Sequence, residues 1–139
     1  MNIDKINGSC LCKQIAFTLI LPVQWVAHCH CSMCRKAQGA PFVTWVGVLK
    51  KNFVLNLYKS LTDYHSSPDA QRSFCSICGS PLFFQSKRWP EEIHITRASL
   101  PDNTNLQPTA HCFYSDKAPW IDIHDSLPKK GGISGIEPL

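Results

Sequence analysis

Hydrophobic residues occupy every second position in several short segments of the chain, which is the period of a β-strand. In residues 15–21 all the odd positions are large and apolar, and some of the even ones are apolar too, as in a largely buried strand. Residues 53–57 alternate in the same way, and residues 42–49 are rich in β-branched and aromatic side chains. Further short strands are predicted at residues 72–75, 81–85, 92–96 and 109–113. The pattern predicts a mainly β protein.

Ten prolines and seven glycines interrupt these segments and disfavour long helices. The best helical segment is residues 32–38, which Gly39 and then Pro41 would end. Three glycines follow Leu127 and predict a loosely held end of the chain. Because the sequence contains neither an internal repeat nor a linker, we predict one domain over residues 1–128 and a C-terminal tail over residues 129–139.

The chain has 139 residues, of which 44% are hydrophobic and 17% are charged. A chain of this size and composition can bury a hydrophobic core, and the composition excludes an intrinsically disordered protein. No apolar run is long enough to span a bilayer, and residues 1–9 lack the apolar stretch of a signal peptide. These features predict a cytoplasmic protein with no membrane partner.

Eight cysteines are the most unusual feature of the composition. In a cytosolic protein, closely spaced cysteines more often bind metal than form disulfides. All but Cys112 fall into a C-x-C, a C-x-C-x-x-C and a C-x-x-C cluster, namely Cys10 and Cys12; Cys29, Cys31 and Cys34; Cys75 and Cys78. The clusters predict zinc sites.

The C-x-x-C pair at Cys75 and Cys78 is followed by Gly79, as in a zinc knuckle whose tight turn needs positive φ. One knuckle supplies two ligands. Cys10 and Cys12 can supply two more, because residues i and i+2 of an extended segment point the same way. We therefore predict a closed structural zinc site with four thiolates.

The middle cluster places the three thiols of Cys29, Cys31 and Cys34 within six residues. Three protein ligands and one open position are typical of a catalytic zinc. A second structural zinc remains an alternative, and its shell could be closed by Cys112, His28, His30 or His111.

The number of thiolates limits the chemistry of such a centre. Three thiolates give zinc so much electron density that it should be a poor activator of water. A soft site of this kind instead attracts an incoming thiol and holds it as a nucleophilic thiolate. The middle cluster therefore favours thiol chemistry over hydrolysis.

The cysteine motifs resemble those of the glutathione-dependent formaldehyde-activating enzyme family, which also includes centromere protein V. The resemblance rests on residues 8–12 (GSCLC), 28–36 (HCHCSMCRK) and 74–82 (FCSICGSPL), in this order. Residues 117–120 (KAPW) and 125–128 (DSLP) resemble the C-terminal signature of the family. Lys13 departs from the family pattern, which commonly has glycine after the first cysteine pair.

The resemblance implies a β-tent fold, a zinc-ribbon-like arrangement of small antiparallel sheets with one or two short helical turns. It also implies two Zn²⁺ ions per chain, one structural and one with a position for substrate. The ligands it implies are Cys10, Cys12, Cys75 and Cys78 for the first ion and Cys29, Cys31 and Cys34 for the second. The implied activity is the condensation of glutathione with formaldehyde to S-hydroxymethylglutathione, which is classed as that of a carbon–sulfur lyase.

Arg35 and Lys36 follow the middle cluster and are candidates to bind the carboxylates of glutathione. Water or His30 would serve as the proton donor to the new hydroxyl group. The rival interpretation is a non-catalytic zinc module that binds a protein or a small thiol. Nucleic acid is not an expected partner, because the formal charge of +4 is scattered and the zinc thiolates offset most of it. The sequence leaves the oligomeric state open.

Overall fold

The computed structural model describes residues 4–139, so the first three residues of the predicted domain lie outside the described part. The chain divides into two compact units. Unit 1 consists of Met1–Gln24 and Val46–Asn105, and unit 2 consists of Trp25–Trp45 and Leu106–Leu139. Each predicted metal site lies within one unit.

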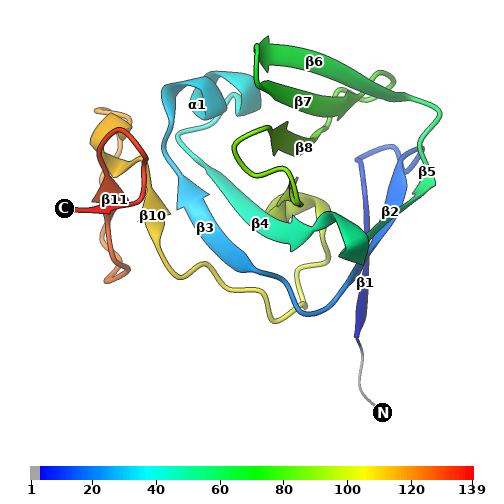
Figure 1. The fold of residues 1–139 in the computed structure, drawn as a ribbon, viewed down its shortest axis with the longest axis horizontal. Coiled ribbons are helices and arrows are strands. Elements are labelled where there is room, and N and C mark those ends of the chain that lie inside the picture. The colour runs from blue at the N-terminus through cyan, green and yellow to red at the C-terminus, as the bar shows by residue number, and fades with distance from the viewer. Residues whose placement is uncertain (1–3) are drawn as a thin grey trace. The chain divides into compact units, whose positions relative to one another are not determined.

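Unit 1 contains a small antiparallel sheet in the order β1-β2-β5, formed by β1 (Lys5–Ser9), β2 (Ala16–Ile20) and β5 (Phe53–Leu57). A second antiparallel ladder follows the order β9-β8-β7-β6. Its strands are β6 (Leu61–Ser67), β7 (Ala70–Cys75), β8 (Pro81–Ser86) and β9 (Glu92–Thr96). Figure 1 shows β6 and β7 side by side. Two 3₁₀ turns, η1 (Lys50–Asn52) and η2 (Arg97–Ser99), complete the unit.

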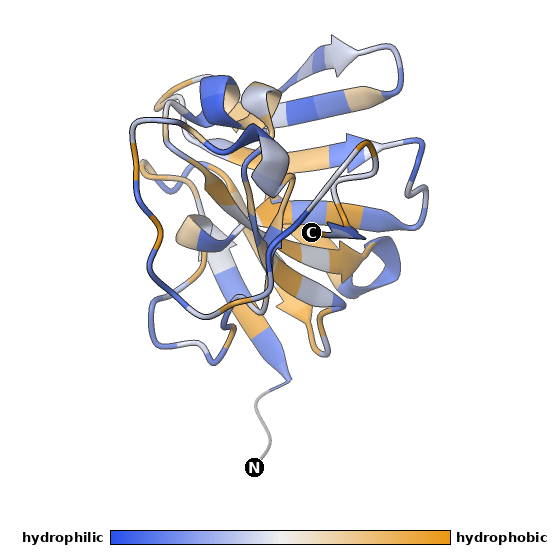
Figure 2. Ribbon diagram, turned by 90° about the vertical axis from the view of Figure 1, so that its left-hand side faces the viewer, coloured by the Kyte–Doolittle hydropathy of each residue, from blue (hydrophilic) through white to orange (hydrophobic). Residues whose placement is uncertain are grey.

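An aromatic cluster forms the core of unit 1. The rings of Phe17, Phe53 and Phe83 lie 5.1 to 5.6 Å apart, and the Phe83 ring meets both others nearly edge-on. Leu19 and Ile95 are fully buried in the same unit. Figure 2 shows hydrophobic residues along the strands and hydrophilic residues in most of the turns. Burial of this apolar surface is the main force that holds the sheets together.

Unit 2 contains β3 (Trp25–Cys29), α1 (Ser32–Gln38), the start of β4 (Val43–Leu49) and β10 (His111–Cys112). The strand order is β10-β3-β4, and β10 pairs with β3 in parallel. After η3 (Tyr114–Asp116), the strands β11 (Lys130–Gly131) and β12 (Glu137–Pro138) form a small hairpin. This hairpin lies in the segment that the glycines mark as loosely held, and the side chain of Ser115 binds the backbone N–H of Gly132 there.

The predicted mainly β fold, with small antiparallel sheets and short helical turns, is confirmed. The predicted helix at residues 32–38 and the predicted strands at residues 53–57 and 92–96 have the observed limits. Residues 109–113 are shorter in the structure, where only His111 and Cys112 form a strand. The strands β1, β3 and β6 were not predicted, because their sequences KINGS, WVAHC and LTDYHSS show no regular alternation.

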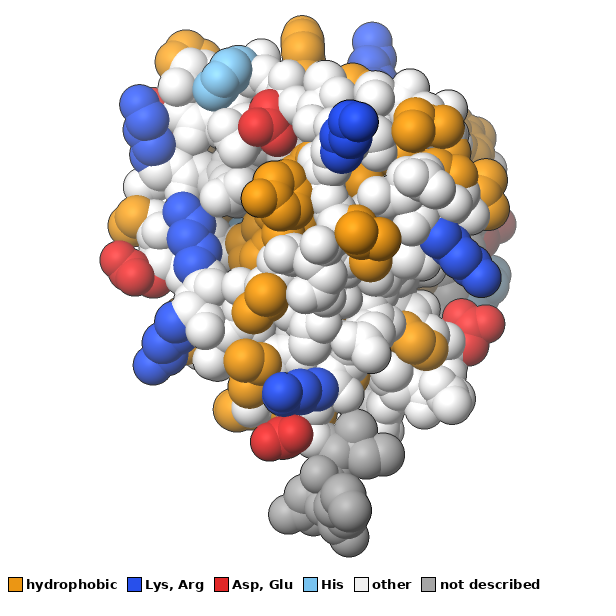
Figure 3. Space-filling view, turned by 90° about the vertical axis from the view of Figure 1, so that its right-hand side faces the viewer, with side chains coloured by type: hydrophobic (Ala, Val, Ile, Leu, Met, Phe, Trp, Pro, Cys, Tyr) orange, Lys and Arg blue, Asp and Glu red, His pale blue; other side chains and the backbone are white. Residues whose placement is uncertain are grey.

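The described part of the chain has no helix with the length and apolar character needed to cross a membrane. On the face drawn in Figure 3, the lysine and arginine side chains are mostly separated from one another by polar and hydrophobic groups. None of the eight cysteines forms a disulfide in the structure.

Candidate functional site

Four cysteines from two distant segments of unit 1 come together. Every ligand sulfur of this group lies within 4.8 Å of the others. Cys12 Sγ is 3.6 Å from Cys10 Sγ and 3.7 Å from Cys75 Sγ, and Cys78 completes the group. Four sulfurs about 2.3 Å from a tetrahedral zinc ion lie about 3.8 Å apart. The group therefore has the spacing needed to hold a metal ion.

The turn after β7 forms one side of this cluster. The backbone N–H of Gly79 donates to the carbonyl of Cys75 over 2.8 Å, and the N–H of Cys78 points at Cys75 Sγ over 3.5 Å. Gly79 has φ of 77°, the left-handed conformation that glycine adopts without a steric cost. The pair thus has the geometry of the predicted knuckle.

The turn after β1 forms the other side. Lys13 N–H donates to the carbonyl of Cys10 over 3.1 Å, and Ile15 N–H lies 3.3 Å from Cys10 Sγ. Cys10 and Cys12 therefore lie in a tight turn and not in the extended segment that the sequence suggested. A turn brings the two sulfurs together as an extended segment would, but it also supplies a backbone N–H group to a sulfur.

Lys13 occupies the position where the family pattern has glycine, and its φ is 66°. A non-glycine residue in this conformation costs roughly 1–2 kcal/mol. Glycine avoids this cost but loses more conformational entropy on folding, which offsets part of the gain. We expect Lys13→Gly to raise the free energy of unfolding by about 0.5–1 kcal/mol. Denaturant titration of the metal-loaded protein measures the change. Lys13→Ala removes the same charge but keeps the backbone strain, so an equal gain in both variants would contradict this explanation.

Hydrogen bonds favour the thiolate form at two of these sulfurs. The Ser80 hydroxyl, 3.1 Å from Cys78 Sγ, is the main reason that the pKa of Cys78 falls to about 5. The Ser60 hydroxyl, 3.4 Å from Cys75 Sγ, lowers the pKa of Cys75. At Cys12 a hydrogen bond from the Gln14 backbone lowers the pKa, but desolvation and the neighbouring sulfurs raise it to about 12. Four thiolates this close repel one another unless a cation lies among them.

The middle cluster lies in unit 2, where β3 ends and α1 begins. Cys29 is the last residue of β3, Cys31 is the residue before α1, and Cys34 is buried on the first turn of the helix. Cys29 Sγ and Cys34 Sγ are 3.7 Å apart, again the spacing of tetrahedral zinc ligands. Within residues 4–139, however, only the four-cysteine group of unit 1 has all its ligand atoms within 4.8 Å. The three middle sulfurs are therefore gathered less tightly.

Hydrogen bonds from the thiols of Cys29 and Cys34 hold the pKa of Cys31 far below its ordinary value, and the backbone N–H groups of Cys34 and Met33 add to this effect. The pKa of Cys29 is raised, first because its thiol donates to Cys31 and Cys34 and also because it is buried. The thiol of Cys31 thus ionises more readily than that of Cys29. A thiolate is the form that binds metal.

Cys112 lies across from Cys29 in the parallel pairing of β10 with β3. Paired residues of neighbouring strands place their side chains on the same face of a sheet. Burial raises the pKa of the half-buried Cys112 thiol, which disfavours a free thiolate there. Because it pairs with Cys29, Cys112 could be the fourth ligand of a structural ion at the middle cluster.

The two basic candidates have different surroundings. Arg35 is half-buried, and its Nε–H donates to the carbonyl of His30 over 3.4 Å. Lys36 is exposed on the next position of α1. Arg35 is therefore held beside the segment that carries the three cysteines, whereas Lys36 faces solvent.

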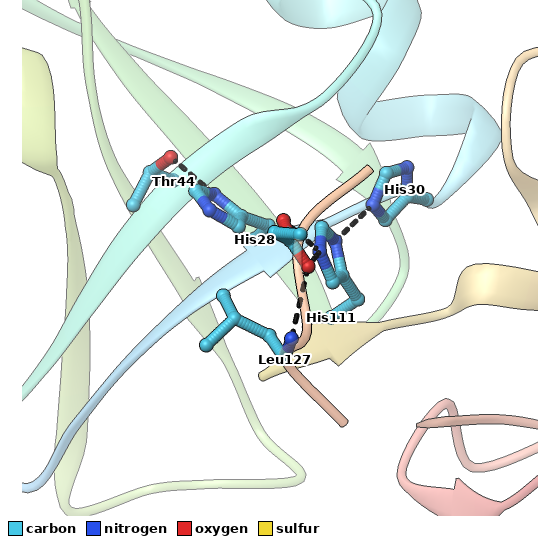
Figure 4. A network of polar contacts seen from close by, with 6 residues as sticks. His28, His30, Thr44, His111 and Leu127 are labelled. Carbon is cyan, nitrogen blue, oxygen red and sulfur yellow. Dashed lines mark hydrogen bonds and ion pairs between the residues drawn. The ribbon is translucent and has the colours of Figure 1, made fainter. Parts of the chain in front are cut away.

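A chain of hydrogen bonds runs through two histidines of unit 2, His30 and His111 (Figure 4). His30 Nε2 is 2.8 Å from His111 Nδ1, and His111 Nε2 is 2.8 and 3.0 Å from the two oxygens of Asp125. His28 Nδ1 is bound separately to the hydroxyl of Thr44 over 2.8 Å. Burial, and then the nearby imidazole of His111, lowers the pKa of His30 to about 4. The hydrogen bond from His111 lowers the pKa of Asp125.

Sequence reasoning named His30 and His111 only as separate candidates and did not connect them to Asp125. His30 and His111 are 81 positions apart, and β10 is only two residues long. The parallel pairing of β10 with β3 brings the two imidazoles together, with His111 across from His28. No local sequence signal marks this pairing.

The comparison with protein families agrees with the cysteine geometry. The model of a family described as "Glutathione-dependent formaldehyde-activating enzyme" matches residues 5–116. The chain belongs to this family. The matched region contains all seven clustered cysteines, and the predicted family resemblance is confirmed.

Individual relatives in this family are distant. A Halomonas elongata protein named "Putative glutathione-dependent formaldehyde-activating enzyme" is 28% identical over 127 residues, which cover 85% of this chain and 80% of that protein. A Schizosaccharomyces pombe protein named as an uncharacterized lyase is 35% identical over 78 residues, 56% of each chain. A crystal structure of a Rhodobacter sphaeroides protein, 22% identical, superposes with a TM-score of 0.57 over 72% of this chain and 91% of that one. The last comparison shows a shared fold.

Proposed function

We propose that the chain is a zinc-dependent carbon–sulfur lyase that joins glutathione, or a related thiol, to formaldehyde or another small aldehyde. The observation that carries the proposal is the separate cluster of Cys29, Cys31 and Cys34 in a member of the formaldehyde-activating family. The four cysteines of unit 1 lie close enough together to form the complete shell of a structural ion. Three thiols in unit 2 are then available for a second ion with one position to spare.

The ligands proposed for the second ion are Cys29, Cys31 and Cys34. The 3.7 Å between Cys29 Sγ and Cys34 Sγ suits two ligands of one tetrahedral ion, and the lowered pKa of Cys31 suits a thiolate ligand. When bound, a zinc ion with three thiolates would supply a soft fourth position that favours an incoming thiol in its ionised form.

The reaction joins the sulfur of the thiol to the carbonyl carbon of the aldehyde. The thiol first loses its proton to water as it ionises. The C–S bond then forms as the π electrons of the C=O bond move to oxygen, and a proton from water converts that oxygen into the hydroxyl of a hemithioacetal. The contribution of the protein is to hold thiol and aldehyde in a reactive orientation, which replaces a bimolecular encounter. Arg35, held by its hydrogen bond to the His30 carbonyl, would bind a carboxylate of glutathione, and Lys36 would add a second positive charge.

Replacement of zinc by cobalt gives a direct test of the fourth position. Glutathione should change the visible spectrum of the cobalt-substituted protein, because its sulfur would become a cobalt ligand. The change should grow as pH rises, since coordination requires the thiolate and releases a proton. S-methylglutathione keeps the carboxylates but cannot ionise at sulfur, so it should alter the spectrum at least tenfold less at equal concentration.

An unchanged spectrum, with both sites loaded, would indicate a closed shell and favour the non-catalytic zinc module. The place of Cys112 across from Cys29 gives that rival a specific form, in which Cys112 is the fourth ligand. Loss of the second ion in Cys112→Ser would then support the rival. Retention of the ion together with a spectral response to glutathione would support the enzyme.

A further inference from the structure

The hydrogen-bond chain from Asp125 to His30 has a surface end and a buried end. The side chain of Asp125 is 40% exposed, whereas the His111 side chain is 1% exposed and His30 is fully buried. The Phe42 and Tyr114 rings lie 5.1 and 5.2 Å from the His30 ring. His30 is thus held by aromatic rings packed around it and by the hydrogen bond at Nε2.

When both imidazoles are neutral, the hydrogen-bond chain determines which ring nitrogen of each histidine carries the proton. The ionised Asp125 can only accept, so His111 donates from Nε2 and its Nδ1 becomes an acceptor. His30 must then donate from Nε2 to His111 Nδ1. Its own Nδ1 is left as an unprotonated acceptor.

That acceptor has no hydrogen-bond partner among residues 4–139, although it is buried. Figure 4 shows the second nitrogen of His30 on the side of the ring away from His111. Buried polar atoms in native proteins are nearly always bonded, and an unbonded one indicates a missing water, ion or ligand. Because His30 lies between Cys29 and Cys31 in the chain, a ligand at the middle cluster is the candidate partner nearest in the sequence.

The proposed reaction produces one group that fits a fixed acceptor. A thiolate and a carbonyl oxygen cannot donate a hydrogen bond, whereas the hydroxyl of a hemithioacetal can. We propose that Asp125 and His111 are positioning residues that hold His30 Nδ1 as the hydrogen-bond acceptor for the hydroxyl group of the hemithioacetal. This inference rests on the proposed function and adds a residue that determines ligand specificity. A site built to bond a hydroxyl discriminates strongly against an analogue that lacks one.

Asp125→Asn tests this role of Asp125, because the two side chains have nearly the same shape. Asp125 Oδ1 accepts the backbone N–H of Leu127 over 3.0 Å, so the oxygen of the asparagine should stay there and its NH₂ group should face His111 Nε2. His111 Nε2 would then have to accept, His111 Nδ1 would donate, and His30 would carry its proton on Nδ1. One substitution should therefore reverse both tautomers. Asp122→Asn is the matched control, because Asp122 is an exposed carboxylate in the same segment.

The experiment uses the full-length, zinc-loaded protein with ¹⁵N-labelled histidine. Two-bond ¹H–¹⁵N spectra identify each tautomer, and the titrated ligand is S-hydroxymethylglutathione, formed from glutathione and formaldehyde. We expect the Nε2–H tautomer of His30 in the wild type and in Asp122→Asn, and the Nδ1–H tautomer in Asp125→Asn. The hemithioacetal should shift the wild-type Nδ1 resonance, and S-methylglutathione should not. Asp125→Asn should bind the hemithioacetal at least tenfold more weakly, with unchanged zinc content and unchanged affinity for glutathione.

Three results would overturn the inference. They are an Nδ1–H tautomer in the wild type, a bound hemithioacetal that leaves the Nδ1 resonance in place, and reversed tautomers without weaker hemithioacetal binding. If Asp125→Asn does not fold, the wild-type tautomer and the ligand-induced shift still decide. Failure of the proposed function is seen separately, as a cobalt spectrum that does not respond to glutathione. If the cobalt spectrum does not respond to glutathione and no hydroxyl ligand moves the Nδ1 resonance, both the proposed function and this inference are refuted.

Discussion

Cys75→Ser is expected to lose one metal ion per chain and to unfold at a far lower temperature than the wild type. Cys75 is fully buried, and its sulfur is 3.7 Å from Cys12 Sγ and 3.4 Å from the Ser60 hydroxyl. The proposed zinc ion would cross-link the turn after β1 to the turn after β7, which are 63 positions apart at Cys12 and Cys75. Structural zinc in small domains contributes an apparent free energy on the order of 10 kcal/mol, most of which depends on a complete ligand shell.

Elemental analysis and thermal denaturation followed by circular dichroism measure the two losses. Cys112→Ser is the control for the melting temperature, since it makes the same chemical change at a half-buried cysteine outside the four-cysteine group. A chelator should lower the melting temperature of the wild type toward that of Cys75→Ser. A Cys75→Ser protein with wild-type metal content and melting temperature would show that the group is not a structural site.

Cys31→Ser is expected to lose the other ion and most of the catalytic activity while unit 1 keeps its fold. Cys31 is half-buried before the first turn of α1, and the backbone N–H groups of Met33 and Cys34 support its thiolate form. Serine is a poor zinc ligand at neutral pH because its hydroxyl does not ionise readily. The loss of a ligand should reduce the catalysed rate at least about a hundredfold.

The rate is measured by NMR exchange between glutathione, formaldehyde and their adduct, after subtraction of the uncatalysed addition. Cys75→Ser and Cys31→Ser together test the division of labour between the clusters. Equal losses of stability in the two variants would contradict it. Full activity in Cys31→Ser with one ion lost would also remove the middle cluster from the proposed mechanism.

Much of the local structure was predictable because it depends on neighbouring residues. The period of two in residues 53–57 predicted β5, and Gly39 correctly marked the end of α1, where it has φ of 61°. The C-x-x-C-G pattern predicted a knuckle in which Gly79 has positive φ. In each case the geometry follows from side chains or turn requirements within a few positions.

The strands β3 and β10 depended on tertiary structure. The two-residue β10 is defined only by its parallel partner, and β3 has no regular alternation of hydrophobic residues. Their pairing aligns His111 with His28 and Cys112 with Cys29. A register between segments that are more than 80 positions apart depends on long-range packing, which local periodicity does not encode.

The sequence by itself determined the family and the seven clustered cysteines as candidate ligands, because ligand spacing along the chain is a local property. Only the tertiary structure decided that the four sulfurs of Cys10, Cys12, Cys75 and Cys78 lie within 4.8 Å of one another. It alone decided that Asp125, His111 and His30 form one hydrogen-bonded chain. Hydrogen bonds of this kind require atoms within about 3 Å, and only the packing of the folded chain brings such distant residues that close.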